Sequence, residues 1–234
     1  MKKFILVFTL LIAIQSFAQE NGENKLGSWH MYFGTTKVSD KLSIHSEAQL
    51  RYFEQAKNFN QLLLRTGLNY HINANAIATI GYGYITTDGT FEEFSNEENA
   101  KEHRIFEQFI LKNKVSNVAF EHRYRLEQRF LNSGNNSDTQ HRARYRLQVT
   151  VPLTKIVFLN FYDEIFLNLQ NEIFSQNRLY GAIGFNVFKN VSLQVGYLKN
   201  HFKSAHYDRL QIGVVINTDL RKSDKNKDDE STKN

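Results

Sequence analysis

The residues of this sequence with the greatest capacity for chemistry are arginines and glutamates placed at every second position. Arg142, Arg144 and Arg146 show the spacing. A guanidinium group holds carboxylates through paired hydrogen bonds and tolerates partly dry space, whereas lysine prefers bulk water. Such residues can fill an enclosed space with ion pairs, line a passage for anions or hold an anionic ligand. The predicted lumen polar network is Glu47, Arg51, Arg65, Arg104, Glu121, Arg123, Arg125, Glu127, Arg129, Arg142, Arg144, Arg146, Glu164, Arg178 and Arg209.

A spacing of two is the repeat of a β-strand, in which successive side chains lie on opposite faces. Apolar residues take the other parity, as Tyr124 and Leu126 do beside Arg123 and Arg125. About eleven such segments, each of about ten to thirteen residues, follow one another along nearly the whole chain. We therefore predict an all-β fold, an antiparallel up-and-down outer-membrane β-barrel of about 10–12 strands.

Several features favour a membrane barrel over a barrel with an apolar interior. The segments exceed the usual strand of about five or six residues and suit a tilted membrane crossing. Tyrosines and phenylalanines lie toward the segment ends, as in the aromatic girdles of membrane barrels. All arginines except Arg221 lie within segments, whereas the lysines of the mature chain lie in turns, loops, strand ends or the tail. Connections alternate between short and long, as outer-membrane turns and loops do.

Two features conflict with this prediction. An odd number of strands departs from the even number of bacterial single-chain barrels, and the first strand, Ser28 to Val38, would begin on the side of the long loops. The last strand is followed by a polar tail instead of ending the chain on an aromatic residue. A missed strand or one misjudged connection would account for the odd number.

The chain divides into four predicted parts. Residues 1–18 carry the basic start, apolar run and small residues of a secretory signal peptide, so we expect export through the Sec pathway to the cell outer membrane. Residues 19–27 form a polar lead, residues 28–220 the transmembrane barrel and residues 221–234 a disordered polar tail. A mean hydropathy of -0.48 excludes a helical membrane protein, and the absence of cysteine excludes disulfides and cysteine-ligated metals.

No sequence motif of an enzyme is present. The sequence lacks His-Glu-x-x-His, Gly-x-Ser-x-Gly and a glycine-rich phosphate loop. His201, Ser204, His206 and Asp208, at one predicted hairpin tip, are the best catalytic candidates, yet hydrogen bonding at the lumen or rim is the default for all the histidines. The segment from Asp88 to Glu102 is an acidic surface loop whose spacing does not match an EF-hand. We predict no catalytic residue, no metal site and no cofactor.

A short internal repeat raises a question about one glutamate. Residues 102–109 are echoed by residues 121–130, with one residue fewer between the two halves of the first copy. The parity of Glu107 is thereby reversed relative to Arg104. Either a β-bulge returns Glu107 to the polar face, or Glu107 lies at a rim.

The repeat and several further motifs resemble a family of exported bacterial proteins catalogued as a domain of unknown function, family 2490. The motifs are Leu63 to Leu68, Gly81 to Tyr84, Arg142 to Leu147 before Pro152-Leu153, Glu164 to Phe166, Gln176 to Arg178, and Gly196-Tyr197. The resemblance covers nearly all of the mature chain and implies an outer-membrane β-barrel. It implies no activity, so no catalytic residue is carried over.

The function expected from the sequence is a structural protein or a narrow pore with an Arg/Glu-lined interior for small anionic solutes, and not an enzyme. One alternative is a barrel enzyme acting on lipid or peptide at the outer rim, and another is a soluble periplasmic ligand-binding β-barrel. Expected partners are outer-membrane lipid, lipopolysaccharide and the barrel-assembly machinery. The net charge of +5 is small and unclustered, so no nucleic acid is expected, and we expect a monomer.

Overall fold

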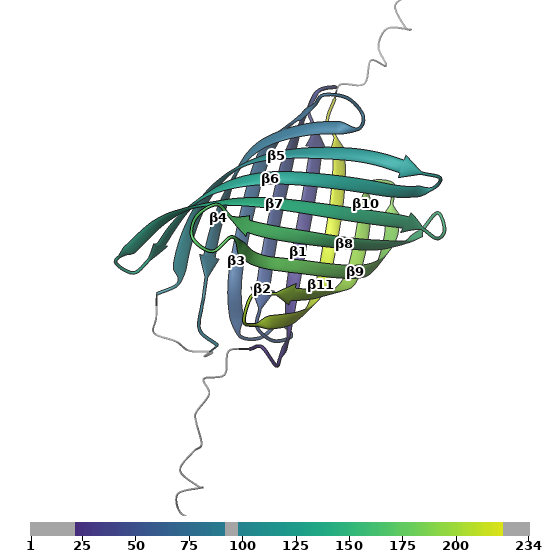
Figure 1. Cartoon of the computed structure of the whole chain (residues 1–234). Coiled ribbons are helices and arrows are strands. Elements are labelled where there is room, and N and C mark those ends of the chain that lie inside the picture. The colour runs from purple at the N-terminus through teal and green to yellow at the C-terminus, as the bar shows by residue number, and fades with distance from the viewer. Residues whose placement is uncertain (1–21, 92–97, 222–234) are drawn as a thin grey trace, which may run out of the picture.

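Eleven strands close into one barrel in the computed structural model, which describes residues 22–91 and 98–221 (Figure 1). The strands are β1 (Leu26–Lys37), β2 (Leu42–Tyr52), β3 (Phe59–His71), β4 (Ala76–Thr87), β5 (Ala100–Val115), β6 (Val118–Ser133), β7 (Asn136–Pro152), β8 (Val157–Asn168), β9 (Phe174–Phe188), β10 (Val191–His201) and β11 (His206–Asp219). The all-β barrel prediction is confirmed. Across these residues no helix is long and apolar enough to cross a membrane.

The predicted terminal parts are only partly covered by the structure. Residues 1–18, predicted as the signal peptide, lie outside the described residues, as does the predicted tail beyond Arg221. The polar lead is described only from Gly22, and β1 begins inside it at Leu26.

The barrel closes through a parallel pair of strands. β1 runs parallel to β11, from Leu26 beside Asp208 to Lys37 beside Asp219, whereas every other neighbouring pair is antiparallel. An odd number of alternating strands gives the first and last the same direction, so only a parallel seam can close the ring. The odd number of strands therefore needs neither a missed strand nor a misjudged connection.

The two ends of the barrel differ in their connections. One end, here the short-turn end, carries the β1–β2, β3–β4, β5–β6, β7–β8 and β9–β10 turns; the opposite end, here the long-loop end, carries the remaining connections and the start of β1. The β6–β7 connection departs from the predicted alternation, because it lies at the long-loop end and is a tight turn, where the sequence predicted a long loop from Asn132 to Asp138. β6 and β7 stay paired up to Ser133 and Asn136, and the turn uses Gly134 at φ 54°, a left-handed conformation that glycine adopts without a Cβ clash.

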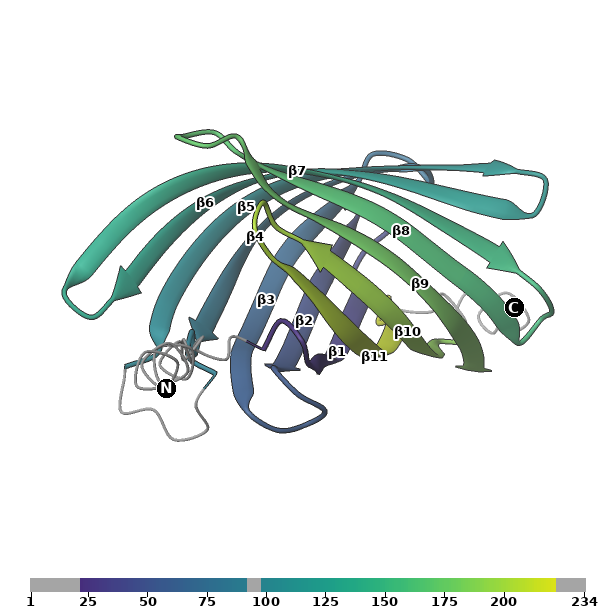
Figure 2. The ribbon, with the colours of Figure 1, turned by 60° about the horizontal axis from the view of Figure 1, so that its bottom comes forward.

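The strand lengths are uneven around the barrel. β5, β6 and β7 have 16, 16 and 17 residues, whereas β1, β2 and β10 have 12, 11 and 11. Figure 2 shows β6 and β7 arching across the side opposite β1 and β11. The longest strands therefore form the wall that carries the densest run of arginine and glutamate.

The apolar parity faces outward and the polar parity faces the lumen. On β6, Tyr124 and Leu126 are 47% and 50% exposed, whereas Arg125 and Glu127 between and beside them are 3% and 1% exposed. The lumen also holds one small apolar cluster of Trp29, Tyr180, Ala182 and Leu198. The interior is thus mainly polar, with this apolar cluster contributed by β1, β9 and β10.

Glu107 follows neither of the two interpretations offered by the repeat. β5 and β6 stay in continuous register through it, so no bulge is present, and Glu107 lies opposite Leu126 in the middle of β5, facing outward. Its carboxylate accepts a hydrogen bond from Gln128 Nε2 at 3.2 Å. The neighbouring Phe106 faces the lumen, as its position two residues after Arg104 requires, and Gly81 leaves room for its ring, which a Cβ at that glycine would approach to 2.3 Å.

Candidate functional site

The predicted lumen polar network lies on the inner face of the barrel. Ten of its members are buried: Glu47, Arg51, Arg65, Arg104, Arg125, Glu127, Arg142, Arg144, Glu164 and Arg209. Five are partly exposed: Glu121, Arg123, Arg129, Arg146 and Arg178. Strand alternation alone brings them to one face, and closure of the barrel makes that face an interior.

Glu127 is the centre of the network. Its side chain is 0% exposed. One carboxylate oxygen, Oε2, accepts hydrogen bonds from Arg142 Nε and Nη2 at 2.9 and 2.6 Å, and the other, Oε1, accepts one from Arg144 Nη1 at 2.7 Å. Guanidinium nitrogens of Arg104 and Arg125 lie 3.6 Å from Oε1. Four cations therefore surround one desolvated carboxylate.

Arg144 connects this centre to a second carboxylate. Its Nε and Nη2 donate to Glu164 Oε1 at 3.0 and 2.7 Å, while its Nη1 donates to Glu127. Glu164 Oε1 also accepts a hydrogen bond from Arg123 Nη2 at 2.7 Å. Both carboxylates are buried, so the pairs gain strength from the low local dielectric and each depends on the others for its charge balance.

The register explains why carboxylates are needed at these points. Arg123 lies directly opposite Arg146, and Arg125 lies directly opposite Arg144, across the β6–β7 pair. Like charges opposite each other repel. Glu164, from β8, contacts arginines of both opposed pairs, which relieves the repulsion.

Smaller clusters continue the network along the lumen. On β2 and β3, Glu47 Oε2 accepts a hydrogen bond from Arg65 Nη1 at 2.7 Å and lies 3.1 Å from His45 Nε2. On β6 and β7, Glu121 Oε1 accepts a hydrogen bond from Arg146 Nη2 at 2.7 Å. Each cluster pairs a carboxylate of one strand with a guanidinium of its neighbour.

Glu102 belongs to the lumen and not to the acidic loop in which the sequence placed it. It lies within β5, is 7% exposed, and accepts hydrogen bonds from Arg104 Nε at 2.7 Å and Arg129 Nη2 at 2.9 Å. The signal was present, because Glu102 shares the parity of Arg104. Of the acidic loop, residues 92–97 lie outside the described residues.

Aromatic rings in the lumen were missed because they share the parity of the polar residues. Phe106 is 0% exposed and contacts the guanidinium groups of Arg65 and Arg125, whose central carbons lie 5.4 and 4.9 Å from its centroid. Phe166 is 1% exposed and contacts three arginines, Arg144 closest at 4.1 Å. Cation–π contact lets a guanidinium bury one face without a carboxylate.

The lumen contains a region poor in carboxylates near the long-loop end. Arg51 donates to the neutral side chains of Gln49 and Gln61, and its guanidinium lies 3.8 Å from the centroid of the Trp29 ring. Arg178 lies 4.9 Å from the same ring. No carboxylate of the described residues lies within ion-pair distance of either guanidinium, so neither has a direct carboxylate partner.

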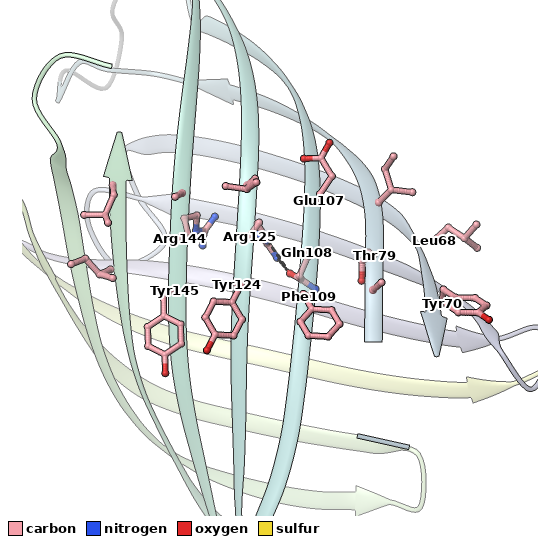
Figure 3. A pocket seen from close by; sticks show the side chains of 16 residues that line it. Leu68, Tyr70, Thr79, Glu107, Gln108, Phe109, Tyr124, Arg125, Arg144 and Tyr145 are labelled. Atoms are coloured by element: carbon pink, nitrogen blue, oxygen red, sulfur yellow. Dashed lines mark hydrogen bonds between the residues drawn. The ribbon is translucent and has the colours of Figure 1, made fainter. Parts of the chain in front are cut away.

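The outer face carries an apolar groove of about 700 Å³ across β3 to β8. Figure 3 shows the rings of Phe109, Tyr124 and Tyr145 side by side in it, with the hydrogen bond between Arg125 and Gln108 at the wall. The hollow lies mainly between outward side chains, and Arg125 and Arg144 of the polar network are among the residues that line it.

The predicted catalytic candidates are not joined by hydrogen bonds to one another. Asp208 accepts a hydrogen bond from Tyr197 and pairs with Lys199 at 2.8 Å, whereas His206 Nδ1 lies 3.2 Å from Glu23 and is 58% exposed. Within the described ranges, no group of three or more histidine, aspartate or glutamate side chains is placed to hold a metal ion.

These features define the chain as a closed eleven-stranded β-barrel with a buried arginine–glutamate network. A family model described as a protein of unknown function (DUF2490) matches residues 26–211, so the chain belongs to that family, as the sequence motifs predicted.

The other comparisons add less. No curated protein matches the chain. Among solved structures, the chain is similar to the siderophore receptor PirA from Pseudomonas aeruginosa, with 10% identity and a TM-score of 0.33. The similarity covers 74% of this chain and 34% of that receptor, so the chain spans about a third of the receptor's length.

Proposed function

We propose that the protein is an outer-membrane β-barrel, exported through the Sec pathway, whose lumen is closed by its arginine–glutamate network and which acts as a structural membrane protein and not as an enzyme. The observation that carries the proposal is the bridge of Arg144 between Glu127 and Glu164, all three of them buried. Hydrated pore walls screen their charges with water, whereas these three side chains are buried and hydrogen-bonded to one another.

The membrane location is supported by the outward face. Large apolar side chains are exposed on strands around the barrel, including Leu50, Leu68, Ile80, Leu126, Phe161, Leu179, Val195 and Ile212. A soluble protein rarely exposes apolar surface of this extent. Outer-membrane lipid, lipopolysaccharide and the barrel-assembly machinery are the proposed partners, and the monomer is the proposed unit.

One substitution tests the location. Leu126→Arg places a charge at the middle of β6 on the outward face, where in a membrane it costs about 2–4 kcal/mol. Leu153→Arg is the matched control, because Leu153 is 55% exposed but lies in the β7–β8 turn. We expect only Leu126→Arg to lower the urea midpoint in lipid vesicles. Equal midpoints for the two variants, or recovery of the protein in the soluble fraction, contradict the location.

A narrow pore for small anions is the second candidate function. This function is favoured by the excess of positive charge in the lumen, since the lumen polar network together with Glu102 contains eleven arginines and five glutamates. Planar-bilayer recording separates the two functions. We expect no steady conductance from the closed barrel; steady, anion-selective conductance overturns closure and establishes the pore.

A further inference from the structure

Arg178 differs from every other arginine of the lumen network. It is the only one of them that makes no hydrogen bond or ion pair to the described residues. Its strand neighbour Glu164 is occupied at Oε1 by Arg123 and Arg144. Its other neighbour, Asn200, is buried, and the Asn200 Oδ1 atom has no hydrogen-bond partner. Arg178 therefore keeps its full set of donors for another group.

A second guanidinium and a buried indole N–H belong to the same cluster. The Trp29 ring is contacted by Arg51 at 3.8 Å and by Arg178 at 4.9 Å. The indole Nε1 is buried and has no acceptor among the described residues. Two guanidinium groups that share one ring repel each other unless a negative charge lies near both. The nearest described groups of Arg51 are neutral glutamines, which supply none.

The cluster lies toward one end of the barrel. Trp29 lies near the start of β1, Arg178 near the start of β9 and Arg51 at the next-to-last position of β2. All three positions are at the long-loop end of the barrel. The adjoining β10–β11 wall contributes Asn200 and Gln211, whose buried amide oxygens lack partners. These can accept a hydrogen bond from a hydroxyl or a protonated oxygen.

We infer that Arg178, Arg51 and Trp29 form a binding site for a small oxyanion, a carboxylate or phosphate group, at the long-loop end of the lumen. The planar fork of a guanidinium matches two oxygens of such a group, and the indole N–H donates a third hydrogen bond. The inference deepens the proposed function by giving the lumen a ligand class. It does not require the membrane location, because the site lies wholly on the inner face.

Trp29 is the single tryptophan of the chain, so the tryptophan fluorescence of the protein reports on this site alone. The folded barrel in detergent is titrated with inorganic phosphate and, separately, with acetate, at ionic strength held constant by sodium chloride. We expect a saturable change in tryptophan emission. Saturation by phosphate alone assigns a phosphate site, by acetate alone a carboxylate site, and by both a general oxyanion site. No saturable change, or the same change with chloride, overturns the inference.

Two variants locate the binding. Arg178→Gln removes the unpaired guanidinium and is expected to weaken the affinity about tenfold or more, as loss of a charged hydrogen-bond donor does. Arg146→Gln removes an equal charge, but Arg146 pairs with Glu121 and does not contact Trp29. We therefore expect the oxyanion affinity of the Arg146→Gln variant to stay within about twofold of that of the parent protein. An equal loss in both variants shows general charge attraction and overturns the site.

A third variant keeps the test decisive if Arg178→Gln does not fold. Asn200→Asp places a carboxylate opposite Arg178 in the register and is expected to abolish the response by occupying the site. An unchanged response in folded Asn200→Asp overturns the inference. Failure of binding leaves conductance and the Leu126→Arg comparison untouched, so it is distinguishable from failure of the proposed function.

Discussion

Two regions of the lumen use arginine in different ways. On the β6–β8 wall, Arg142, Arg144 and Arg123 each donate to a buried carboxylate at 2.6–2.7 Å. Near the long-loop end between β9 and β2, Arg178 and Arg51 instead share an aromatic ring and have no carboxylate partner.

The difference shows that the neighbours of an arginine decide its role. A guanidinium between two carboxylates is fixed in place, and removing any member leaves a buried charge uncompensated. Ring contact does not use the N–H donors of a guanidinium: those of Arg178 stay free, whereas Arg51 donates to the neutral Gln49 and Gln61. We therefore expect the first region to determine stability and the second to determine ligand binding.

The largest effect is expected for Glu127→Gln. The variant removes a charge that four arginines share and leaves Arg125 and Arg142 buried without a carboxylate partner, at a cost of about 3–5 kcal/mol of unfolding free energy. Arg104 and Arg144 keep Glu102 and Glu164. Urea unfolding in detergent measures the cost. Glu172→Gln is the control, because Glu172 pairs with the exposed Lys203 and its loss should leave the midpoint unchanged. Equal midpoints for the two variants contradict a filled lumen.

A second comparison applies one substitution to both regions. Arg144→Gln breaks ion pairs to two buried carboxylates and should cost about 3 kcal/mol, whereas Arg178→Gln breaks no ion pair and should cost about 1 kcal/mol or less. Thermal unfolding of the two variants side by side checks the difference. If Arg178→Gln proves as costly as Arg144→Gln, the two regions do not differ in the way their contacts indicate.

A third test adds a carboxylate to the carboxylate-poor region near the long-loop end. Asn200→Asp should raise the unfolding free energy by about 1 kcal/mol, because the new charge meets Arg178. Asn160→Asp is the matched control, since Asn160 is equally buried but donates its Nδ2 hydrogen to Gln194 Oε1 at 2.8 Å. There the same change loses a donor and lowers stability. Effects of the same sign at both positions would remove the proposed contrast.

The smallest stability effect is expected for Trp29→Phe. The ring that Arg51 and Arg178 contact is retained, and the lost indole N–H had no acceptor, so the unfolding free energy should change by less than about 1 kcal/mol. Oxyanion affinity, measured in this variant by ligand-dependent thermal shift, should fall. A large stability loss with unchanged affinity would assign Trp29 to packing alone.

Much of the architecture followed from local alternation. The alternation of polar and apolar residues at every second position predicted the strands. It also predicted the two faces, because Arg125 and Glu127 alternate with Tyr124 and Leu126 and a strand exposes successive side chains to opposite sides. The same alternation places Phe106 and Phe166 on the inner face, although they are apolar. What it does not predict is that the lumen has room for such rings, as Gly81 provides for Phe106.

An all-β barrel with arginine and glutamate on one face can be predicted from the amino-acid sequence, because the alternation of side chains along a strand depends only on residues two positions apart. How those residues pair cannot, because the register between strands sets which guanidinium meets which carboxylate. The three-dimensional structure also reveals the parallel pairing of β1 with β11, which joins residues some 180 positions apart, and the carboxylate-poor region at Trp29. Closure of the ring turned one polar face into a buried interior, and burial made each of these pairings matter energetically.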